Sequence, residues 1–357
     1  MNGIRIYNKV YKIGIIGCGR ISKKHIESIN HNQIFDLVSV CDKNKSKLEH
    51  LNLKSNLNTY QDFELMISSE NLDVVSVLTD SGSHENIINK IAGKIKNIIV
   101  EKPFVLTTSG AKRVVKKCIE NSTRIFVVHQ NRLNKTVEQL FELKNQNFFG
   151  KIFLCSVNLY WSRSDEYYNS DRWRGKWISD GGAIANQGIH YIDIIHKLLG
   201  DPYSISADSS TALNKIETED TALINFKYGD GCLVNFQLST AIRPKNIEGS
   251  ISVFSEKGFY MIGGEALNEV KAVKLLNYKE NIDESYVIED VYGKGHQVFY
   301  DKISKSIKNN SESEFDGINF INQIRLLNAI YTSIETSSKI IFDNRKDYKT
   351  KLGTYEN

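Results

Sequence analysis

Several features that mark other classes of protein are scarce in this sequence of 357 residues. It has only five cysteines, an odd number, and they are widely spaced and mostly lie in apolar segments. This pattern provides neither a disulfide framework nor the spacing of a metal site. We therefore expect no bound metal, and buried free thiols in a reducing compartment. The cysteines are Cys18, Cys41, Cys118, Cys155 and Cys232.

Long apolar runs and strong charge are also missing. No stretch approaches the roughly 18 apolar residues of a membrane helix, and the first residues lack the layout of a signal peptide. The formal net charge of +4 is small for this length and does not suggest nucleic-acid binding. With 41% hydrophobic and 25% charged residues, the composition is typical of a globular protein. We expect a cytoplasmic protein of two domains, with no membrane or nucleic-acid partner.

Near its start the sequence contains a glycine turn between a strand and a helix. Residues 11–16 form a short apolar run that breaks into Gly17 and Gly19, and a helical pattern follows. Such a turn lets the backbone approach a diphosphate and directs the positive end of the next helix at it. Ser22 stands where the dinucleotide fingerprint prefers Gly or Ala. A purely structural turn is the alternative interpretation, because many strand–helix connections use glycine.

The end of the second predicted strand favours NAD as the ligand. Residues 37–41 are strand-like, and Asp42 follows them about 20 positions after the turn, where the fingerprint requires an acidic residue. Its carboxylate can accept hydrogen bonds from ribose hydroxyls and would repel a 2′-phosphate, which favours NAD over NADP. Lys43 weakens this preference because it could pair with a phosphate.

Strands and helices then alternate, which predicts a doubly wound parallel sheet. Three further strands, at 73–79, 97–100 and 124–129, each end in polar residues. Polar strand ends are usually ordinary loop chemistry, but here they fall together on the edge where ligands of such sheets bind. The residues are Thr79, Ser81 and His84 after the first strand, Glu101 and Lys102 after the second, and His129, Asn131 and Arg132 after the third.

The second half predicts an α+β domain with a largely antiparallel open sheet. Runs at 150–161, 222–228, 232–240, 251–254, 258–262 and 270–276 are strand-like, and a Gly-Asp-Gly hairpin joins the second and third. One face of such a sheet is left free, and it is a natural subunit contact. We place the dinucleotide-binding domain at 1–130, the substrate-binding and oligomerisation domain at 131–342, and a frayed polar tail at 343–357.

All three tryptophans lie in one segment, residues 160–177, with several tyrosines and arginines. Arginines pair with phosphates and aromatic rings stack on bases or sugars, so the segment suits a nucleotide-sugar pocket or a lid over the cofactor. An ordinary amphipathic loop anchored by tryptophans explains it equally well. Within the segment, Trp173 and Arg174 are the residues of most interest.

Three motifs, in this order and spacing, resemble the glucose–fructose oxidoreductase/inositol dehydrogenase (Gfo/Idh/MocA) family. They are residues 17–21 (GCGRI), 101–103 (EKP) and 180–193 (DGGAIANQGIHYID), and the resemblance covers nearly the whole chain. It implies that Lys102 is the catalytic residue beside the nicotinamide and that His190 is its partner. Family members often have an aspartate four residues before this histidine. Here Asn186 stands there, which counts against any scheme that needs a carboxylate at that position.

The same chemistry can be argued from the residues. Oxidation of a secondary alcohol requires a base for the hydroxyl proton, and a lysine can serve if burial and a positive nicotinamide lower its pKa. His190 lies four residues after Asn186 and three before Asp193, so all three are expected on one helical face. We expect Asp193 to orient the imidazole. A surface lysine and a core histidine are the alternatives.

Within the family, Asn186-Gln187 and residues 129–134 (HQNRLN) are similar to the branch that acts on UDP-N-acetylglucosaminuronic acid. Those enzymes oxidise the sugar C3 hydroxyl on the way to the sugars of surface polysaccharides. The resemblance implies an NAD-dependent nucleotide-sugar dehydrogenase that forms a homodimer or homotetramer through the open sheet. The alternatives are a dehydrogenase of a free sugar or inositol, a ketoreductase of a deoxysugar pathway, and an NAD-binding sensor without turnover.

These arguments and the resemblance together give the expected site. The catalytic residues are Lys102, His190 and Asn186. The cofactor-binding residues are Gly17, Gly19, Arg20, Ile21, Asp42, Lys43, Thr79, Ser81, His84, Glu101, Lys102, Asn131, Trp173 and Arg174. The substrate-binding residues are Lys102, Asn131, Arg132, Tyr160, Asn186, Gln187, His190 and His296, the last of which the resemblance directs at the sugar.

Overall fold

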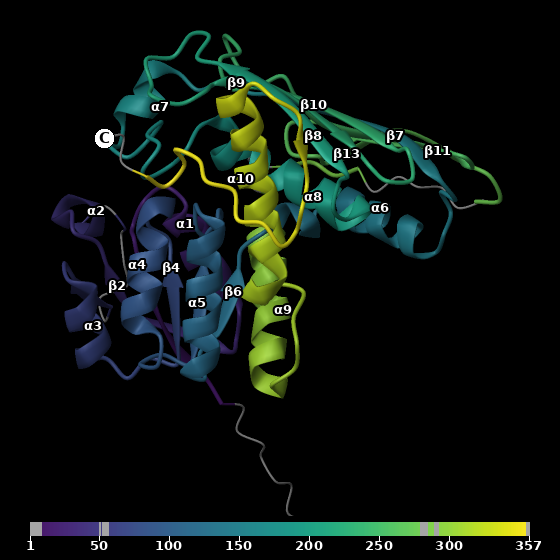
Figure 1. Ribbon diagram of the computed structural model, residues 1–357. Helices are drawn as coiled ribbons and strands as arrows, with labels where there is room; N and C mark the ends of the chain where they lie inside the picture. Colours follow the sequence, from purple (N-terminus) through teal and green to yellow (C-terminus); the bar gives the residue numbers. More distant parts are fainter. Residues whose placement is uncertain (1–8, 50, 52–56, 279–284, 289–292, 355–357) are drawn as a thin grey trace, which may run out of the picture.

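The computed structural model describes residues 9–49, 51, 57–278, 285–288 and 293–354. These residues form two sheets, one parallel and one mixed, with helices packed on each (Figure 1). The fold class expected from the sequence is confirmed.

The first sheet has six parallel strands in the order β3-β2-β1-β4-β5-β6. The order reverses between β1 and β4, and ligands of such sheets bind at the carboxyl ends of the strands at this point. Every residue of β4 and β5 is buried, as expected for central parallel strands covered by helices on both faces. The strands are β1 Tyr11–Ile16, β2 Phe35–Cys41, β3 Asn58–Tyr60, β4 Val74–Val77, β5 Asn97–Val100 and β6 Arg124–Val127. The helices are α1 Ser22–His31, α2 Lys45–Glu49, α3 Phe63–Ser69, α4 Ser81–Ile91 and α5 Thr108–Glu120.

The second sheet has eight strands in the order β13-β12-β11-β7-β10-β9-β8-β14, and only the β7–β10 pairing is parallel. The strands are β7 Ile152–Tyr160, β8 Ser204–Ser210, β9 Thr221–Lys227, β10 Leu233–Ser239, β11 Glu248–Ser255, β12 Gly258–Gly263, β13 Glu269–Leu275 and β14 Ile340–Ile341. The remaining helical elements are η1 Gln130–Leu133, α6 Lys135–Asn145, α7 Asp165–Asn169, η2 Ile184–Gly188, α8 Ile189–Leu199, α9 Gly295–Asn309, η3 Gly317–Phe320 and α10 Ile321–Thr336.

One face of this sheet is covered and the other is open. Alternate residues of β7, namely Cys155, Val157 and Leu159, are buried in one core together with residues of α6, α8 and α10. The opposite face leaves Leu223 and Leu233 about half exposed. In Figure 1, α6 and α8 lie below this sheet, on its covered side.

The last part of the chain ties the two halves together. Helix α9 returns to the first core, where Phe299, Tyr300 and Ile303 are completely buried, and it packs against α1. Helix α10 contributes to both cores, with Ile324 in the first and Leu327 in the second. The halves are therefore joined by contacts made after residue 295, in addition to the connection near residue 130.

The expectation of a frayed tail is wrong for its described part. Tyr348 and Leu352 are buried in the second core, and the Gly353 N–H donates a hydrogen bond to the main-chain oxygen of Trp177 at 2.8 Å. The segment is polar overall, but these two side chains are spaced to pack inward.

Two further features bear on expectations from the composition. All five cysteines are free and buried, as predicted. Among the described residues, no helix is both long and apolar enough to span a bilayer.

The packing of the tail can be tested with Leu352→Ala. Removal of a completely buried leucine side chain is expected to lower the free energy of unfolding by about 2–4 kcal/mol. Urea denaturation of this variant and of Lys349→Ala, at an exposed position of the same segment, measures the difference. Equal stability of the two variants would mean that the tail does not contribute to the core.

Candidate active site

A cavity of about 1420 Å³ lies at the carboxyl ends of the parallel strands, between the two halves. It is larger than the roughly 300–1,000 Å³ of a typical small-molecule site, so it has room for a dinucleotide and a second ligand. Most residues of the expected site line it: Gly17, Gly19, Arg20, Ile21, Asp42, Lys43, Thr79, Ser81, Glu101, Lys102, Asn131, Trp173, Arg174, Asn186, Gln187 and His190.

The two glycines of the turn differ in what they face. Gly17 has a φ of +98°, and a Cβ there would lie 2.7 Å from the carbonyl carbon of Leu78, so the protein's own backbone requires glycine. A Cβ on Gly19 would meet nothing within 4 Å, so this position leaves open space on the cavity side. The Ser22 hydroxyl donates to the main-chain oxygen of Gly19 at 2.7 Å and closes the turn.

Asp42 is fixed at the cavity wall by main-chain donors. Its Oδ2 accepts from the Cys18 N–H and its Oδ1 from the Asn44 N–H, both at 2.8 Å. Each carboxylate oxygen keeps a further lone pair for another donor, such as a ribose hydroxyl. The open space at Gly19, the N-terminus of α1 and this carboxylate together fit the diphosphate and adenosine ribose of NAD.

Lys102 follows β5 and reaches the other half of the molecule. Its Nζ donates to the main-chain oxygen of Asn186 at 2.5 Å. Burial lowers the pKa of Lys102, and the positive charges of Arg163 and Arg174 act in the same direction. The negative charges of Glu101 and Asp180 oppose this shift. The structure therefore brings together the second and third motifs, which are 84 residues apart in sequence at this contact.

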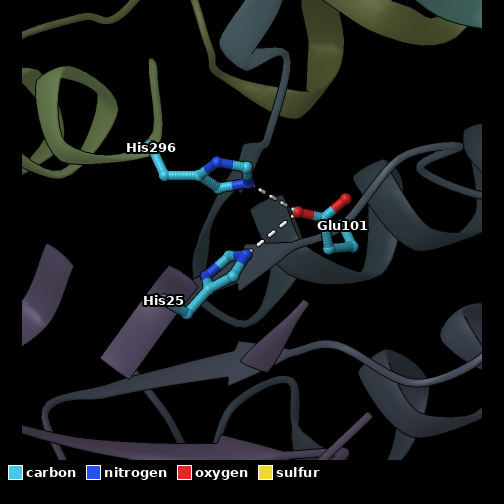
Figure 2. Close-up of side chains that lie close together, drawn as sticks. All are labelled: His25, Glu101 and His296. Atoms are coloured by element: carbon cyan, nitrogen blue, oxygen red, sulfur yellow. Dashed lines mark hydrogen bonds and ion pairs between the residues drawn. The ribbon is translucent and has the colours of Figure 1, made fainter. Parts of the chain in front are cut away.

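Glu101 lies in a buried cluster beneath the cavity, shown in Figure 2. Its Oε1 lies 2.9 Å from His25 Nε2 and 3.4 Å from His296 Nε2. Burial would raise the pKa of Glu101, but the hydrogen bonds from the two histidines hold it well below its usual range. Burial also lowers the pKa of His25, so a neutral His25 donates from Nε2 and accepts from the Tyr300 hydroxyl at Nδ1, 2.8 Å away. The cluster joins α1, β5 and α9 next to Lys102.

These three residues could in principle hold a metal, because their ligand atoms lie within 4.8 Å of one another. In the structure, however, the imidazoles contact the carboxylate directly and hydrogen bonds account for the cluster. His296 does not line the cavity, which corrects the expectation that it faces the sugar.

The third motif forms a π-helical turn, η2, that leads into α8. Such turns are frequent at functional sites. It presents Asn186, Gln187 and His190 to the cavity. The Nδ1 atom of His190 is buried and has no hydrogen-bond partner among the described residues. Burial and the charge of Lys102 hold the pKa of His190 well below its usual range, so the imidazole is neutral.

Asp193 does not orient His190, contrary to expectation. Its carboxylate accepts two hydrogen bonds from Arg132, at 2.5 and 2.6 Å, and one from Gln323 at 2.8 Å. This arrangement ties together η1, α8 and α10. It also occupies Arg132, which does not line the cavity and whose expected contact with substrate is therefore corrected.

Two more expected residues lie outside the cavity lining. His84 is completely buried, and its ring contacts the main-chain oxygens of Thr79 and Pro103 at 3.2 and 3.0 Å, so it fixes the loops around the cofactor site. Tyr160 points to the open face of the second sheet, where its hydroxyl contacts Asn158 and Gln237.

The glycine pair before η2 is explained by packing. Gly181 has a φ of +69°, and a Cβ on Gly182 would lie 2.1 Å from the carboxyl group of Glu219. This buried Glu219 accepts from the Ile184 N–H and the Tyr331 hydroxyl, each at 2.9 Å. Burial raises the pKa of Glu219 to about 7. Contacts within the protein therefore account for both glycines.

Arginines and aromatic rings of the 160–177 segment form one cluster at the cavity. Three guanidinium groups lie over the ring of Tyr167: Arg174 at 4.2 Å, Arg163 at 5.1 Å and Arg20, from the glycine turn, at 5.8 Å. A second link to the first half is the ion pair of Lys47 with Asp171 at 2.7 Å. The segment thus spans from the second domain to the glycine turn and α2.

The sequence pattern assigns no role to two residues of the site, Asp180, which is the first residue of the third motif, and His25 in α1. The functional contacts of both residues involve partners that are distant in sequence. His25 contacts Glu101, and Asp180 binds Asn186, which in turn binds Lys102.

A parallel sheet with a glycine turn, an acidic residue at the end of β2 and a lysine after β5 together define a dinucleotide-binding oxidoreductase. The comparison with known families agrees. Residues 11–129 match the oxidoreductase family with an NAD-binding Rossmann fold, and residues 137–261 match the Gfo/Idh/MocA C-terminal domain. The chain belongs to the Gfo/Idh/MocA family, and its cofactor is NAD.

Two solved structures are similar over almost the whole chain. The WlbA dehydrogenase of Bordetella pertussis, in complex with NADH and UDP-GlcNAcA, is 33% identical, with 94% of this chain and 99% of that chain covered and a TM-score of 0.86. The WlbA dehydrogenase of Chromobacterium violaceum, with the same two ligands, is 30% identical, with 95% and 97% covered and a TM-score of 0.87. A D-apiose dehydrogenase of Paraburkholderia graminis is 26% identical over 62% of this chain and 59% of its own length.

The different surroundings of Gly17 and Gly19 predict different effects of alanine at the two positions. Gly19→Ala is expected to leave the free energy of unfolding within about 1 kcal/mol of wild type, because the Cβ meets no protein atom, and to weaken NADH binding at least about tenfold. Gly17→Ala is expected to lose both NADH affinity and about 1–3 kcal/mol of stability. NADH fluorescence titration and urea denaturation separate the two effects. Unchanged NADH affinity in Gly19→Ala would contradict the placement of the diphosphate.

Proposed function

We propose that this protein is an NAD-dependent dehydrogenase of nucleotide sugars that oxidises the C3 hydroxyl of UDP-N-acetylglucosaminuronic acid, in the biosynthesis of surface-polysaccharide sugars. The observation that carries the proposal is the meeting of Lys102, Asn186 and His190 in a cavity continuous with the glycine turn. The similarity to two WlbA dehydrogenases crystallised with NADH and UDP-GlcNAcA supports the substrate.

In this proposal Lys102 removes the proton of the C3 hydroxyl. Bound NAD supplies the hydride acceptor. Lys102 suits the role of base because burial and two nearby arginines lower its pKa. The neutral His190, with a buried Nδ1 that lacks a protein partner, donates to or accepts from the reacting oxygen. Asn186 positions Lys102 through its main-chain oxygen.

The nucleotide end of the substrate is assigned to the 160–177 segment. Arg163, Arg174 and Trp173 line the cavity together with Tyr167. Arginine guanidinium groups bind the oxygens of a diphosphate in pairs, and aromatic rings stack on a base or sugar. A free sugar has neither a diphosphate nor a base, so this combination of arginines and aromatic rings favours a nucleotide sugar as substrate.

We further propose a homo-oligomer, a dimer or tetramer, in which the open face of the second sheet is the contact. Leu154, Leu223 and Leu233 are exposed on this face. Exposed apolar side chains that group on one sheet face are typical of subunit contacts.

A dehydrogenase of a free sugar is the second candidate, and the similarity to a D-apiose dehydrogenase favours it. The test is a panel of UDP-N-acetylglucosaminuronic acid, the same sugar without UDP, D-apiose and inositol, read by NADH absorbance. We expect activity on the nucleotide sugar and a loss of at least about 100-fold when the UDP is removed. Activity that does not depend on UDP would support the second candidate, and tight NAD binding without any turnover would support a sensor.

Substitution of Lys102 tests the chemistry. Lys102→Ala is expected to lower kcat by about 10²–10⁴-fold, the usual contribution of a general base, with little change in NADH affinity. In the wild type, kcat/KM is expected to rise with pH, because the amine accepts a proton only after it has lost its own, and this rise is expected to be absent in Lys102→Ala. Undiminished turnover of Lys102→Ala would remove this residue from the mechanism.

A further inference from the structure

Asp180 is a buried carboxylate that connects to Lys102 through one residue. Only 2% of it is exposed. Its Oδ2 accepts from the Gly175 N–H at 3.0 Å, and its Oδ1 accepts a short hydrogen bond from the Asn186 side-chain amide. The main-chain oxygen of the same Asn186 accepts from Lys102 Nζ at 2.5 Å. The Asp180 carboxylate therefore binds the side-chain amide of Asn186, and the Lys102 amine binds the main-chain oxygen of the same residue.

The contacts of Asn186 fix its orientation. Its Nδ2 group donates to Asp180, and its Oδ1 accepts from Gln187 Nε2 at 2.5 Å. Because an amide has donors on one side and an acceptor on the other, only one of its two flipped orientations satisfies both contacts. An aspartate at position 186 would place two carboxylates against each other, so the asparagine here is matched to Asp180.

The charge of Asp180 also acts on the amine. Burial raises the pKa of Asp180 to about 6. The hydrogen bonds from the Gly175 N–H and the Asn186 amide, and the charges of Arg174 and Lys102, act in the opposite direction and lower it. Above about pH 6 the group is therefore ionised, and its negative charge favours the protonated form of Lys102. The other titratable or charged groups that interact with this pair are Tyr168, Arg163, Arg174, Glu101, His129, His190 and Glu219.

We propose that Asp180 is a positioning residue for Lys102, and that it supplies through the Asn186 amide the carboxylate that position 186 lacks. Asp180 holds the main-chain oxygen of Asn186, in η2, within hydrogen-bond distance of Lys102 Nζ and keeps a negative charge near the amine. The catalytic consequence rests on the proposed function, whereas the coupling between the two groups does not.

The test is Asp180→Asn in the full chain with NAD bound. Asparagine keeps the shape but removes the charge and one of the two acceptors. Competitive labelling of lysines with acetic anhydride, read by mass spectrometry, gives the pH at which Lys102 becomes reactive. Loss of one nearby negative charge is expected to lower this midpoint by about one pH unit. Glu166→Gln, which removes an exposed carboxylate at the cavity lining, is the matched control and is expected to leave the midpoint unchanged.

The exchange variant Asp180→Asn/Asn186→Asp keeps one carboxylate and one amide in contact. It is expected to bring the Lys102 midpoint back to within about half a unit of wild type. A folded Asp180→Asn with an unchanged midpoint would overturn the proposal. If Asp180→Asn does not fold, the exchange variant decides, and either its failure to fold or a midpoint that differs from wild type by a unit or more would overturn it.

Activity separates the two proposals. With UDP-N-acetylglucosaminuronic acid, Asp180→Asn is expected to shift the acid limb of kcat/KM to lower pH by the same amount and to lower kcat about tenfold or more, with KM little changed. A wild type that does not oxidise this sugar, with the labelling shift still present, would reject the proposed function alone. An acid limb that stays in place in an active Asp180→Asn would reject the role of Asp180 in catalysis.

Discussion

The hydrogen bond from Lys102 Nζ to the main-chain oxygen of Asn186 is the contact on which the geometry of the site depends. It joins the end of a parallel strand in the first half to the π-helical turn of the second. A lysine in a partly desolvated position needs acceptors, since an unpaired ammonium group there is costly. Here a carbonyl provides one acceptor and leaves the remaining two N–H bonds of the ammonium for other partners.

Each side of this contact is held by a separate buried network. On the strand side, Glu101 is fixed by His25 and His296, so β5 is tied to α1 and α9. On the turn side, Glu219 accepts from the Ile184 N–H at the start of η2, while Asp193 in α8 binds Arg132 of η1. Buried carboxylates with several donors are expensive to disturb, because removal of one partner leaves a charge uncompensated. These networks thus hold β5 and η2 in place on the two sides of the contact between Lys102 and Asn186.

The sequence predicted the parts of this arrangement that depend on local pattern. Apolar runs and glycines give the strands, the turn and the parallel arrangement of the first sheet, and the position of Asp42 follows from the fingerprint. The partners of buried polar groups were predicted poorly. Helical spacing predicted that Asp193 shares a helical face with His190, but it could not indicate Arg132, 61 residues away, as the partner of Asp193. Tyr160 was also assigned to the cavity. The alternation of buried and more exposed residues along β7 places its side chain on the open face of the sheet instead.

The balance of charge around Lys102 bears on how a strongly anionic substrate can be used there. A diphosphate close to the amine would favour its protonated form and so oppose its action as a base. Arg163 and Arg174 lie on the Tyr167 ring and lower the pKa of Lys102, and in the proposed complex they pair with the diphosphate. The two negative charges of the diphosphate are then matched by two positive charges already present. A site of this kind can accept the charged half of its substrate and still keep the lysine able to take up a proton.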